Sequence, residues 1–343
     1  MPPQALVTGA TGCVGANVVA ALLARGYDVR AMRRTTSSLD ALDGLDPALV
    51  VGDVLNPVSL VTAMRDCAFV FHIAAVSDYW RTPAERIYQV NVEGTRNVLA
   101  AALETGVERL VYTSSIGALG MPPPGRFLDE SAAFNLPPRR FPYGHSKHLA
   151  EQAVQEAIAQ GLDAVIVNPT GVIGARDVHF IGGSVLREVQ RGLSWFAPPG
   201  GLNWVDAETL GLGHVLAAER GRTGERYILG GENVSHWAAM EIVVEVVGGR
   251  RPLATLPRLL MSVIVLLTDG FNTLWPGTPL FSGEQVRLSR VEIYCDCRKA
   301  QQELELPCTP FRTAVEQAYA WYLAHGYLRP GASYPRCVAD TSA

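Results

Sequence analysis

The stretch that decides the fold reads QALVTGATGCVG and runs from Gln4 to Gly15. An apolar run ends at Val7, and an alanine-rich stretch from Ala16 to Arg25 follows the glycines. This order predicts a strand, a tight glycine turn and a helix. Units of this kind bind the pyrophosphate of a dinucleotide at the positive N-terminus of the helix.

Each of the three glycines has its own task in such a turn. Gly9 allows the tight turn, Gly12 lets backbone N–H groups approach a pyrophosphate, and Gly15 lets the helix pack close to the strand. The alternative is a glycine-rich loop without a ligand, but the flanking strand and helix favour a dinucleotide. We therefore predict that a cofactor contacts Gly9, Thr11, Gly12, Cys13, Val14 and Gly15.

The second predicted strand, from Asp28 to Arg33, ends on basic residues. An NAD-specific site has a carboxylate there for the ribose 2′-hydroxyl, whereas this chain has Arg33 and Arg34. Two guanidinium groups can hold a 2′-phosphate through charge-assisted, bidentate hydrogen bonds. An ordinary solvated basic pair is the alternative. The two arginines favour NADP(H) over NAD(H) as the cofactor.

Further apolar runs alternate with helical patterns along the chain. This alternation predicts an α/β fold with a doubly wound parallel sheet of the Rossmann type. Glycine-, proline- and tryptophan-rich sequence interrupts the alternation and predicts a smaller, discontinuous substrate lobe. The predicted strands lie near residues 49–51, 69–73, 109–113, 164–167 and 226–229, and the predicted helices near 84–104 and 143–159.

The 343 residues suffice for one large α/β domain with an added lobe. We place the boundaries where the alternation stops and returns. The NADP-binding Rossmann domain takes residues 1–170 and 204–231. The substrate-binding lobe takes residues 171–203 and 232–328, and residues 329–343 form a flexible tail.

In a doubly wound sheet the ligand lies at the carboxyl ends of the strands. After the third strand comes Asp53, whose carboxylate can accept a hydrogen bond from an adenine amino group. After the fourth come Ala74 and Ala75, which are small enough for the backbone to pass close to a ribose. The cofactor contacts predicted from such positions are Asp53, Val54, Ala74, Ala75, Thr113, Pro169 and Thr170.

Tyr143 and Lys147 are four residues apart at the start of a helical pattern, which puts both side chains on one face. A free tyrosine keeps its proton up to about pH 10. A neighbouring ammonium lowers that pKa because it favours the phenolate. The pair is therefore a candidate proton donor or acceptor near neutral pH. The alternative is a surface tyrosine near a solvated lysine. The predicted dinucleotide site favours the functional interpretation over this alternative.

The formal net charge of −4 gives no electrostatic reason to expect a nucleic-acid partner. No basic segment or cleavage site precedes the first strand, which predicts a cytoplasmic protein. The six cysteines are mostly isolated, and Cys295-Asp296-Cys297 lacks the second pair of ligands that a zinc site needs. We expect reduced thiols and no bound metal.

The longest apolar stretch, residues 259–267, is about half as long as a bilayer-spanning helix. We expect a helix buried against the substrate lobe. The alternative is an interfacial segment that gives weak membrane association and lets the protein reach an apolar substrate.

Together these motifs resemble the extended short-chain dehydrogenase/reductase superfamily, which includes the NAD-dependent epimerase/dehydratase family. Within it, residues 29–34 are similar to a dihydroflavonol-reductase-like branch, and residues 203–233 to bacterial hopanoid-associated sugar epimerases. The resemblance extends from near residue 4 to near residue 328 and rests on the glycine turn, Gly52-Asp53-Val54, His72-Ile73-Ala74-Ala75, Asn91-Val92-Glu93-Gly94-Thr95, Thr113-Ser114-Ser115 and Tyr143-x-x-x-Lys147.

The resemblance implies a catalytic triad. Ser115 would hydrogen-bond the substrate oxygen, and Tyr143 would exchange the proton. Lys147 would bind the nicotinamide ribose and lower the tyrosine pKa. Arg34 stands at the position that meets the 2′-phosphate in the reductase branch, with Arg33 in place of the NAD-type carboxylate.

Two residues depart from the family pattern. Cys13 stands where an aromatic or bulky aliphatic residue is usual, and His145 lies inside the Tyr-x-x-x-Lys motif. A histidine can be an auxiliary proton group, but we expect His145 to point away from the cofactor.

Relatives often pair through the helices near 84–104 and 143–159, so a homodimer is also expected.

The resemblance leaves three functions open. We expect an NADPH-dependent reductase of a ketone, or the reverse oxidation of an alcohol, on a moderately large and largely apolar small molecule. A nucleotide-sugar epimerase or dehydratase would use the same triad and would need cations such as Arg187, Arg191 and Arg287. The third function is a non-catalytic NADP-binding regulator. The substrate contacts expected in the second lobe and nearby are Ser77, Tyr79, Trp80, Trp195 and Trp204.

Overall fold

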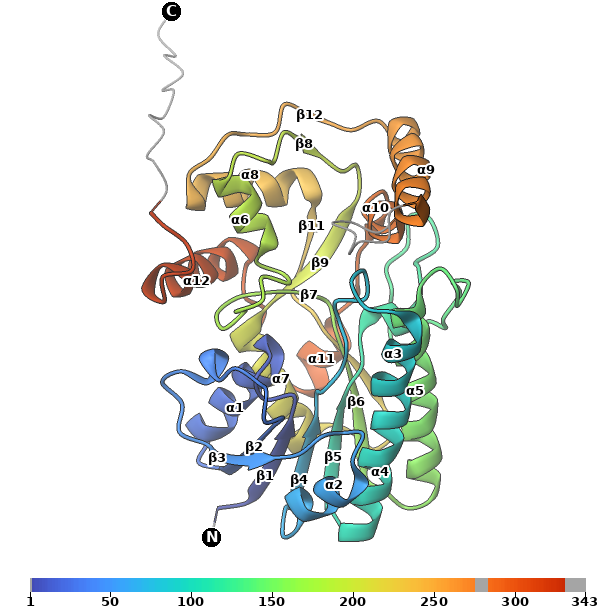
Figure 1. The fold of residues 1–343 in the computed structure, drawn as a ribbon, viewed down its shortest axis with the longest axis vertical. Helices are drawn as coiled ribbons and strands as arrows, with labels where there is room; N and C mark the ends of the chain where they lie inside the picture. The colour runs from blue at the N-terminus through green and yellow to red at the C-terminus, as the bar shows by residue number, and fades with distance from the viewer. Residues whose placement is uncertain (1, 275–282, 331–343) are drawn as a thin grey trace, which may run out of the picture.

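A seven-stranded parallel sheet forms the centre of the molecule (Figure 1). The computed structural model describes residues 2–274 and 283–330. The strand order β10-β6-β5-β4-β1-β2-β3 reverses between β1 and β4, where a doubly wound sheet binds its ligand. The strands are β1 (Gln4–Thr8), β2 (Asp28–Arg33), β3 (Ala48–Val51), β4 (Phe69–His72), β5 (Arg109–Thr113), β6 (Ala164–Pro169) and β10 (Arg226–Leu229).

Helices cover both faces of this sheet. Successive side chains of a strand point to opposite faces, so Val7 joins one buried apolar cluster and Leu6 joins the other. The covering helices are α1 (Cys13–Ala24) and α7 (Ala207–Arg220) on the Val7 face, and α2 (Pro57–Met64), α4 (Gly94–Thr105) and α5 (Pro142–Ala159) on the Leu6 face.

The structure confirms the predicted α/β class and the doubly wound parallel sheet. β2, β5 and β10 have the predicted bounds. The helix predicted near residues 84–104 is interrupted in the middle, because a π-helical turn (Gln89–Glu93) separates α3 (Ala84–Tyr88) from α4. Asn91 in this turn accepts a hydrogen bond from the Val76 N–H (2.8 Å) and donates one to Ser146 Oγ (3.0 Å). The turn thereby connects the loop after β4 to α5.

A second lobe lies beyond the carboxyl ends of the sheet strands (Figure 1). In its small sheet, β7 and β13 pair with β9 in parallel, and β11 pairs with β9 in antiparallel. β8 and β12 form a separate ribbon at the outer end. The elements are β7 (Gly171–Ile173), α6 (Ser184–Gln190), β8 (Phe196–Ala197), β9 (Gly201–Asp206), β11 (Glu232–Ser235), α8 (His236–Val247), β12 (Ala254–Thr255), α9 (Arg258–Leu274), α10 (Gly283–Leu288), β13 (Glu292–Ile293) and α12 (Phe311–Ala324).

The chain passes between the two lobes more than once. β9 runs to Asp206, past the predicted return to the Rossmann domain at residue 204. A short helix, α11 (Arg298–Glu303), goes back to the Rossmann layer, where Ala300 and Leu304 join the cluster that contains Val7. Of the predicted tail, residues 331–343 lie outside the described part of the chain.

The apolar stretch 259–267 lies in α9, and its two faces differ. Met261 and Val265 are only 4% and 5% exposed, whereas Leu259 and Leu266 are 84% and 71% exposed. The expected burial against the lobe is therefore wrong for one face, because α9 packs on α10 with the opposite side only. Among the described residues, no helix is both long enough and apolar enough to cross a membrane.

The glycine turn after β1 has little room for side chains. Gly9 has a φ of +68°, and a Cβ on Gly15 would lie 2.1 Å from the Gly9 carbonyl oxygen. The closeness of α1 to the turn therefore requires glycine at position 15. A Cβ on Gly12 would lie 3.5 Å from the same oxygen, which is an ordinary contact. Packing alone therefore does not account for Gly12.

We predict different effects for alanine at these two positions. Gly15→Ala forces α1 away from the turn, and overpacking of this kind costs about 1–3 kcal/mol in the free energy of unfolding. Gly12→Ala keeps nearly normal stability, because its Cβ meets no close neighbour. Urea unfolding of both variants checks the prediction, and equal stability of the two would contradict it.

Candidate active site

The N-terminus of α1 is open toward the carboxyl end of the sheet. Gly12 is the N-cap residue, and no side chain caps the first turn. Uncapped N–H groups at the positive end of a helix suit a pyrophosphate. The Cys13 thiol contacts the Ala175 carbonyl (Sγ to O, 3.6 Å), and burial raises its pKa, so Cys13 has only its backbone to offer. The turn therefore fits the pyrophosphate of a dinucleotide, held by backbone groups from Thr11 to Val14.

The two arginines lie where β2 ends. Arg33 Nη1 donates to the carbonyl oxygens of Arg34 (3.3 Å) and Thr35 (3.5 Å), and the Arg34 side chain is exposed. No acidic residue occurs between Arg33 and Leu39. This end of the strand therefore carries positive charge at the position where an NAD-specific site has a carboxylate.

The loops after β3 and β4 bring the other predicted cofactor residues to the same edge. Asp53 Oδ1 accepts a hydrogen bond from the Leu55 N–H (2.9 Å), which fixes the loop, and Val54 is buried. A Cβ on Gly9 would lie 2.7 Å from the Ala74 nitrogen, so the turn and the loop containing Ala74 and Ala75 lie in contact.

The predicted residues after β5 and β6 differ in their surroundings: one is buried and another lines a cavity. Thr113 Oγ1 lies 2.9 Å from His214 Nε2, and burial lowers the pKa of His214 to about 4. The Thr113 hydroxyl therefore hydrogen-bonds with a neutral histidine in the core. Pro169 ends β6, and Thr170 follows it on the wall of a cavity.

Tyr143 lies in the first turn of α5 beside Ser115 and Tyr79. The rings of Tyr79 and Tyr143 stack, with centroids 5.5 Å apart and an angle of 18° between planes. Phe141 contacts both rings edge-on. Ser115 Oγ accepts a hydrogen bond from the Gly117 N–H (3.1 Å) and is also within hydrogen-bonding reach of the Tyr143 phenol.

The pKa of Tyr143 corrects one expectation. Burial raises this pKa above the ordinary value for tyrosine, and the hydrogen bond with Ser115 only partly opposes the rise. In the protein without a dinucleotide the Tyr143 pKa is therefore raised, not lowered as expected. The phenol therefore keeps its proton at neutral pH and is set up as a proton donor.

Lys147 is buried under Tyr143, one turn further along α5. Its Nζ donates to the Thr113 carbonyl (2.7 Å) and lies 5.2 Å from the centre of the Tyr112 ring. Burial lowers the pKa of Lys147 to about 7, while the Glu151 carboxylate raises it. The charge of this lysine therefore changes near neutral pH, and Glu151 helps to keep it.

Glu151 lies one helical turn after Lys147 on α5 and is linked to Ser115 through hydrogen bonds of Asn168. One of its oxygens accepts a hydrogen bond from Asn168 Nδ2 (2.7 Å), and the other pairs with Arg226 (2.9 Å). Asn168 Nδ2 also donates to the Ser115 carbonyl (3.0 Å). This buried carboxylate was not among the predicted site residues, although the spacing of Tyr143, Lys147 and Glu151 could have indicated it.

A cavity of about 310 Å³ opens next to Ser115 and Tyr79. Thr170, His236 and Gln285 are among its polar groups. In the described part of the chain no arginine or lysine lines it. Most of the wall is apolar and comes from both lobes: Ile116, Met121, Leu136, Phe141, Leu202, Leu288 and Ile293.

The predicted substrate residues do not all meet at this cavity. Tyr79 lines it, and Trp80 packs edge-on against Tyr79. Ser77 is exposed in the same loop. Trp195 is 55% exposed beside β8, away from the cavity wall. Trp204 packs on Phe311 with ring centroids 5.4 Å apart, in the core of the second lobe.

His145 points toward α3. Its Nδ1 lies 2.9 Å from the Tyr88 hydroxyl, and its ring packs on Phe134. Neither neighbour lines the cavity. The histidine is therefore directed away from the Ser115 side of Tyr143, as expected.

Comparison with known proteins agrees with this geometry. The model of the NAD dependent epimerase/dehydratase family matches residues 5–230. A Synechocystis protein named "Putative dihydroflavonol 4-reductase" is 39% identical over 329 residues, which cover 94% of this chain and 95% of the relative. Sterol demethylase protein B of Methylococcus capsulatus is 34% identical over 327 residues, covering 94% and 99%. The crystal structure of gox2253 is 34% identical, with a TM-score of 0.84 over 95% of this chain and 99% of that one.

The Glu151 network gives a prediction about the charge of Lys147. The chain has only two lysines, Lys147 and Lys299, so NMR of protein with carbon-13 at lysine Cε follows each one. Lys147 should titrate near pH 7. Glu151→Gln removes the charge that favours the ammonium, so the Lys147 pKa falls further.

Two internal controls accompany this titration. Glu156→Gln changes an exposed residue of the same helix and should leave the Lys147 pKa unchanged. The signal of Lys299, which pairs with Glu225 (2.6 Å), serves as the internal reference that each variant is folded. A Lys147 pKa that stays the same or rises in Glu151→Gln would contradict the role given to Glu151.

Proposed function

The chain belongs to the NAD-dependent epimerase/dehydratase family, and we propose that within this family it is an NADPH-dependent ketone reductase. It is an oxidoreductase of the extended short-chain dehydrogenase/reductase type, and a nicotinamide dinucleotide is its cofactor. What we propose beyond this is the substrate, a ketone, and the form of the dinucleotide, NADPH. The same enzyme could also run the reverse reaction, the oxidation of an alcohol.

The observation that carries the proposal is the apolar cavity beside Ser115 and Tyr79. Apolar side chains from both lobes form most of its wall. A buried apolar wall favours a substrate that loses little hydration on entry. The name of the Methylococcus relative includes a sterol, which is a large apolar molecule. We therefore infer a moderately large, largely apolar ketone.

The side chains supply the proton chemistry of such a reduction. When bound, the dinucleotide supplies a hydride to the carbonyl carbon. Tyr143 gives its phenolic proton to the carbonyl oxygen, which would otherwise become an alkoxide. Ser115 donates a hydrogen bond to that oxygen. Lys147, charged with the help of Glu151, lies one turn below and favours the phenolate that remains.

A nucleotide-sugar epimerase or dehydratase is the second candidate, since the name of the family includes epimerases and dehydratases. A sugar diphosphate needs cations near the cavity. Arg187 stacks on Phe180 (4.5 Å), Arg287 pairs with Glu284 (3.0 Å), and Arg191 is exposed. This arrangement favours the reductase.

Replacing Tyr143 tests the reaction. Tyr143→Phe removes the proton donor and should lower the rate of NADPH oxidation with a panel of apolar aryl and polycyclic ketones by roughly 10²-fold or more. Tyr88→Phe is the matched control, because Tyr88 contacts His145 outside the cavity. Conversion of a nucleotide sugar without net NADPH consumption would replace this proposal by the epimerase.

Replacing Arg34 tests the choice of dinucleotide. Arg34→Ala should weaken NADPH binding roughly ten- to hundredfold, because a hydrogen bond to a charged group contributes about 1.5–3 kcal/mol. NADH binding should change little. Fluorescence titration with both cofactors measures the effect, and exposed Arg126→Ala is the control. Equal weakening of the two cofactors would sink the role of Arg34.

A further inference from the structure

One helix of the second lobe has a large apolar face that nothing in the described chain covers. On α9, Leu259, Leu266 and Leu267 are 84%, 71% and 68% exposed, and Leu260 and Val263 are 47% and 48% exposed. These residues recur at helical spacing and form one stripe. Soluble surfaces rarely keep such a contiguous apolar patch without a partner.

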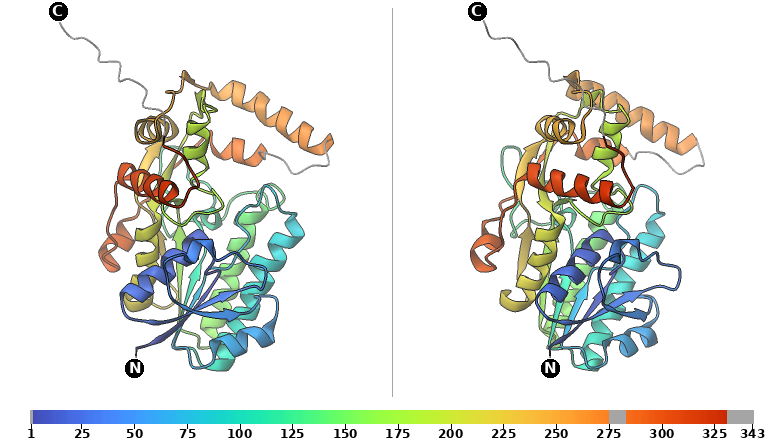
Figure 2. Two further views of the ribbon diagram at one scale, coloured as in Figure 1. Left: turned by 60° about the vertical axis from the view of Figure 1, so that its left-hand side comes forward. Right: turned by 90° about the vertical axis from the view of Figure 1, so that its left-hand side faces the viewer.

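The opposite side of α9 is what attaches it to the lobe. Met261 and Val265 are buried there, and α9 packs on α10. Figure 2 shows α9 extending beyond the other elements of the lobe. The exposed fractions of its leucines place the stripe on the solvent side. The helix is thus apolar on two sides, and only one side contributes to the fold.

More exposed apolar side chains lie at the same outer end. Trp195 and Phe196, beside and on β8, are 55% and 48% exposed, and Leu253, before β12, is 70% exposed. The β8–β12 ribbon and α9 are both at the top of Figure 1. We call the α9 stripe together with these three side chains the tip surface.

Exposed arginines lie beside the tip surface. Arg258 begins α9, and Arg250 and Arg251 precede Leu253; all three are exposed. Arg251 pairs with Glu245 (3.3 Å). For Arg250 and Arg258 no ion pair occurs within residues 2–274 and 283–330. Exposed arginines beside an exposed apolar stripe suit a surface that is anionic outside and apolar beneath.

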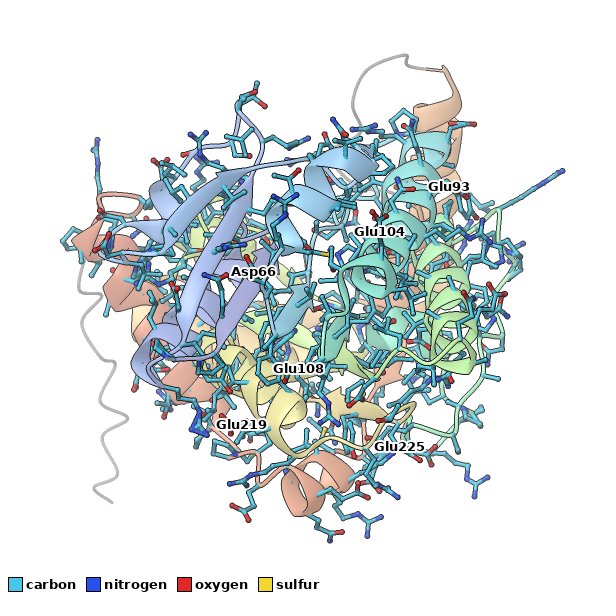
Figure 3. The ribbon with its side chains drawn as sticks, turned by 90° about the horizontal axis from the view of Figure 1, so that it is seen from below. Asp66, Glu93, Glu104, Glu108, Glu219 and Glu225 are labelled. Atoms are coloured by element: carbon cyan, nitrogen blue, oxygen red, sulfur yellow. The ribbon has the colours of Figure 1, made fainter. Side chains whose placement is uncertain are left out.

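Carboxylates lie at the other end of the molecule. Figure 3, seen from below, labels Asp66, Glu104 and Glu108 among its acidic residues. Asp66 lies three residues before β4, Glu108 directly precedes β5, and Glu104 is near the end of α4. Strand starts are opposite to the strand ends that carry the second lobe. Exposed Arg65 lies next to Asp66, so this end carries charges of both signs. The attraction to an anionic surface therefore rests on the arginines of the tip.

We propose that the tip surface docks the protein on an anionic phospholipid bilayer. α9 lies in the plane of the interface with its leucine stripe in the acyl boundary, and Arg250 and Arg258 contact headgroup phosphates. The helix does not span the membrane. Trp195 enters the headgroup region, where its ring can be apolar on its faces and hydrogen-bonded at its N–H.

This docking places the substrate cavity close to the lipid. Gln285 and Leu288 of α10 line the cavity, and α9 packs on α10. A membrane-held α9 therefore has the wall of the cavity directly behind it. The proposed ketone, being largely apolar, would be concentrated in the same bilayer.

Vesicle sedimentation of the full chain tests the docking without any turnover. We expect binding to phosphatidylcholine vesicles that contain phosphatidylglycerol, weaker binding at high salt, and little binding to phosphatidylcholine alone. Leu259→Glu with Leu266→Glu should reduce binding at least about tenfold, because burial of a leucine side chain contributes a factor of that order. Arg250→Glu with Arg258→Glu should remove the preference for anionic lipid.

The control is Val58→Glu, which adds the same charge at a 75% exposed apolar position of α2. It should bind vesicles like the unchanged protein. Circular dichroism and NADPH fluorescence show that each variant folds and keeps its cofactor site. Absence of binding to the anionic vesicles would overturn the proposal. So would a dimer in sedimentation equilibrium that depends on Leu259 and Leu266, since a second copy would then cover the stripe.

The two proposals can fail separately. Loss of vesicle binding with intact NADPH-dependent ketone reduction in detergent-free buffer removes the docking and leaves the reductase. Vesicle binding by a protein that turns over no ketone supports the docking and removes the reductase.

Discussion

The geometry of the site depends on the ion pair and hydrogen bond of one buried carboxylate, that of Glu151. It lies inside the protein, paired with Arg226 and hydrogen-bonded to Asn168. A charge in this setting is tolerated only because its partners compensate for the lost hydration. Those partners belong to β6 and β10, so Glu151 ties α5 to two strands. Through Asn168 it also fixes the backbone of Ser115.

The same carboxylate sets the electrostatics around Tyr143. Burial disfavours the charged forms of both Lys147 and Tyr143, which lowers the lysine pKa and raises the tyrosine pKa. The lowered lysine pKa disfavours the ammonium, and the raised tyrosine pKa disfavours the phenolate that the ammonium would stabilise. Glu151 opposes the lowering of the lysine pKa. The protein without its cofactor therefore holds a protonated phenol above a lysine whose charge depends on one neighbour.

The second lobe combines two kinds of apolar surface. One faces the cavity, whose wall includes Leu202, Leu288 and Ile293. The other is the leucine stripe of α9, which faces outward. α10 lies between them, so the two surfaces share one short helix as their support. This arrangement places the cavity wall directly behind the surface that we propose docks on a bilayer.

The sequence by itself determined the Rossmann layer, because its information is local. The spacing of Gly9, Gly12 and Gly15 and the alternation of apolar runs depend only on neighbours along the chain, and β2, β5 and β10 have the predicted bounds. Ser115, Tyr143 and Thr170 were predicted, and they lie at one edge of the sheet. Trp204 could not be placed from sequence, because an aromatic side chain has the same pattern in a core as in a binding wall.

Only the tertiary structure decided what surrounds these residues. Lys147 meets the carbonyl of Thr113, and Tyr79 stacks on Tyr143, across separations of 34 and 64 positions that no local pattern encodes. Sequence likewise could not tell which face of α9 is buried. An apolar residue has the same hydropathy on either face, and only the position of α10 decides which leucines remain in contact with solvent.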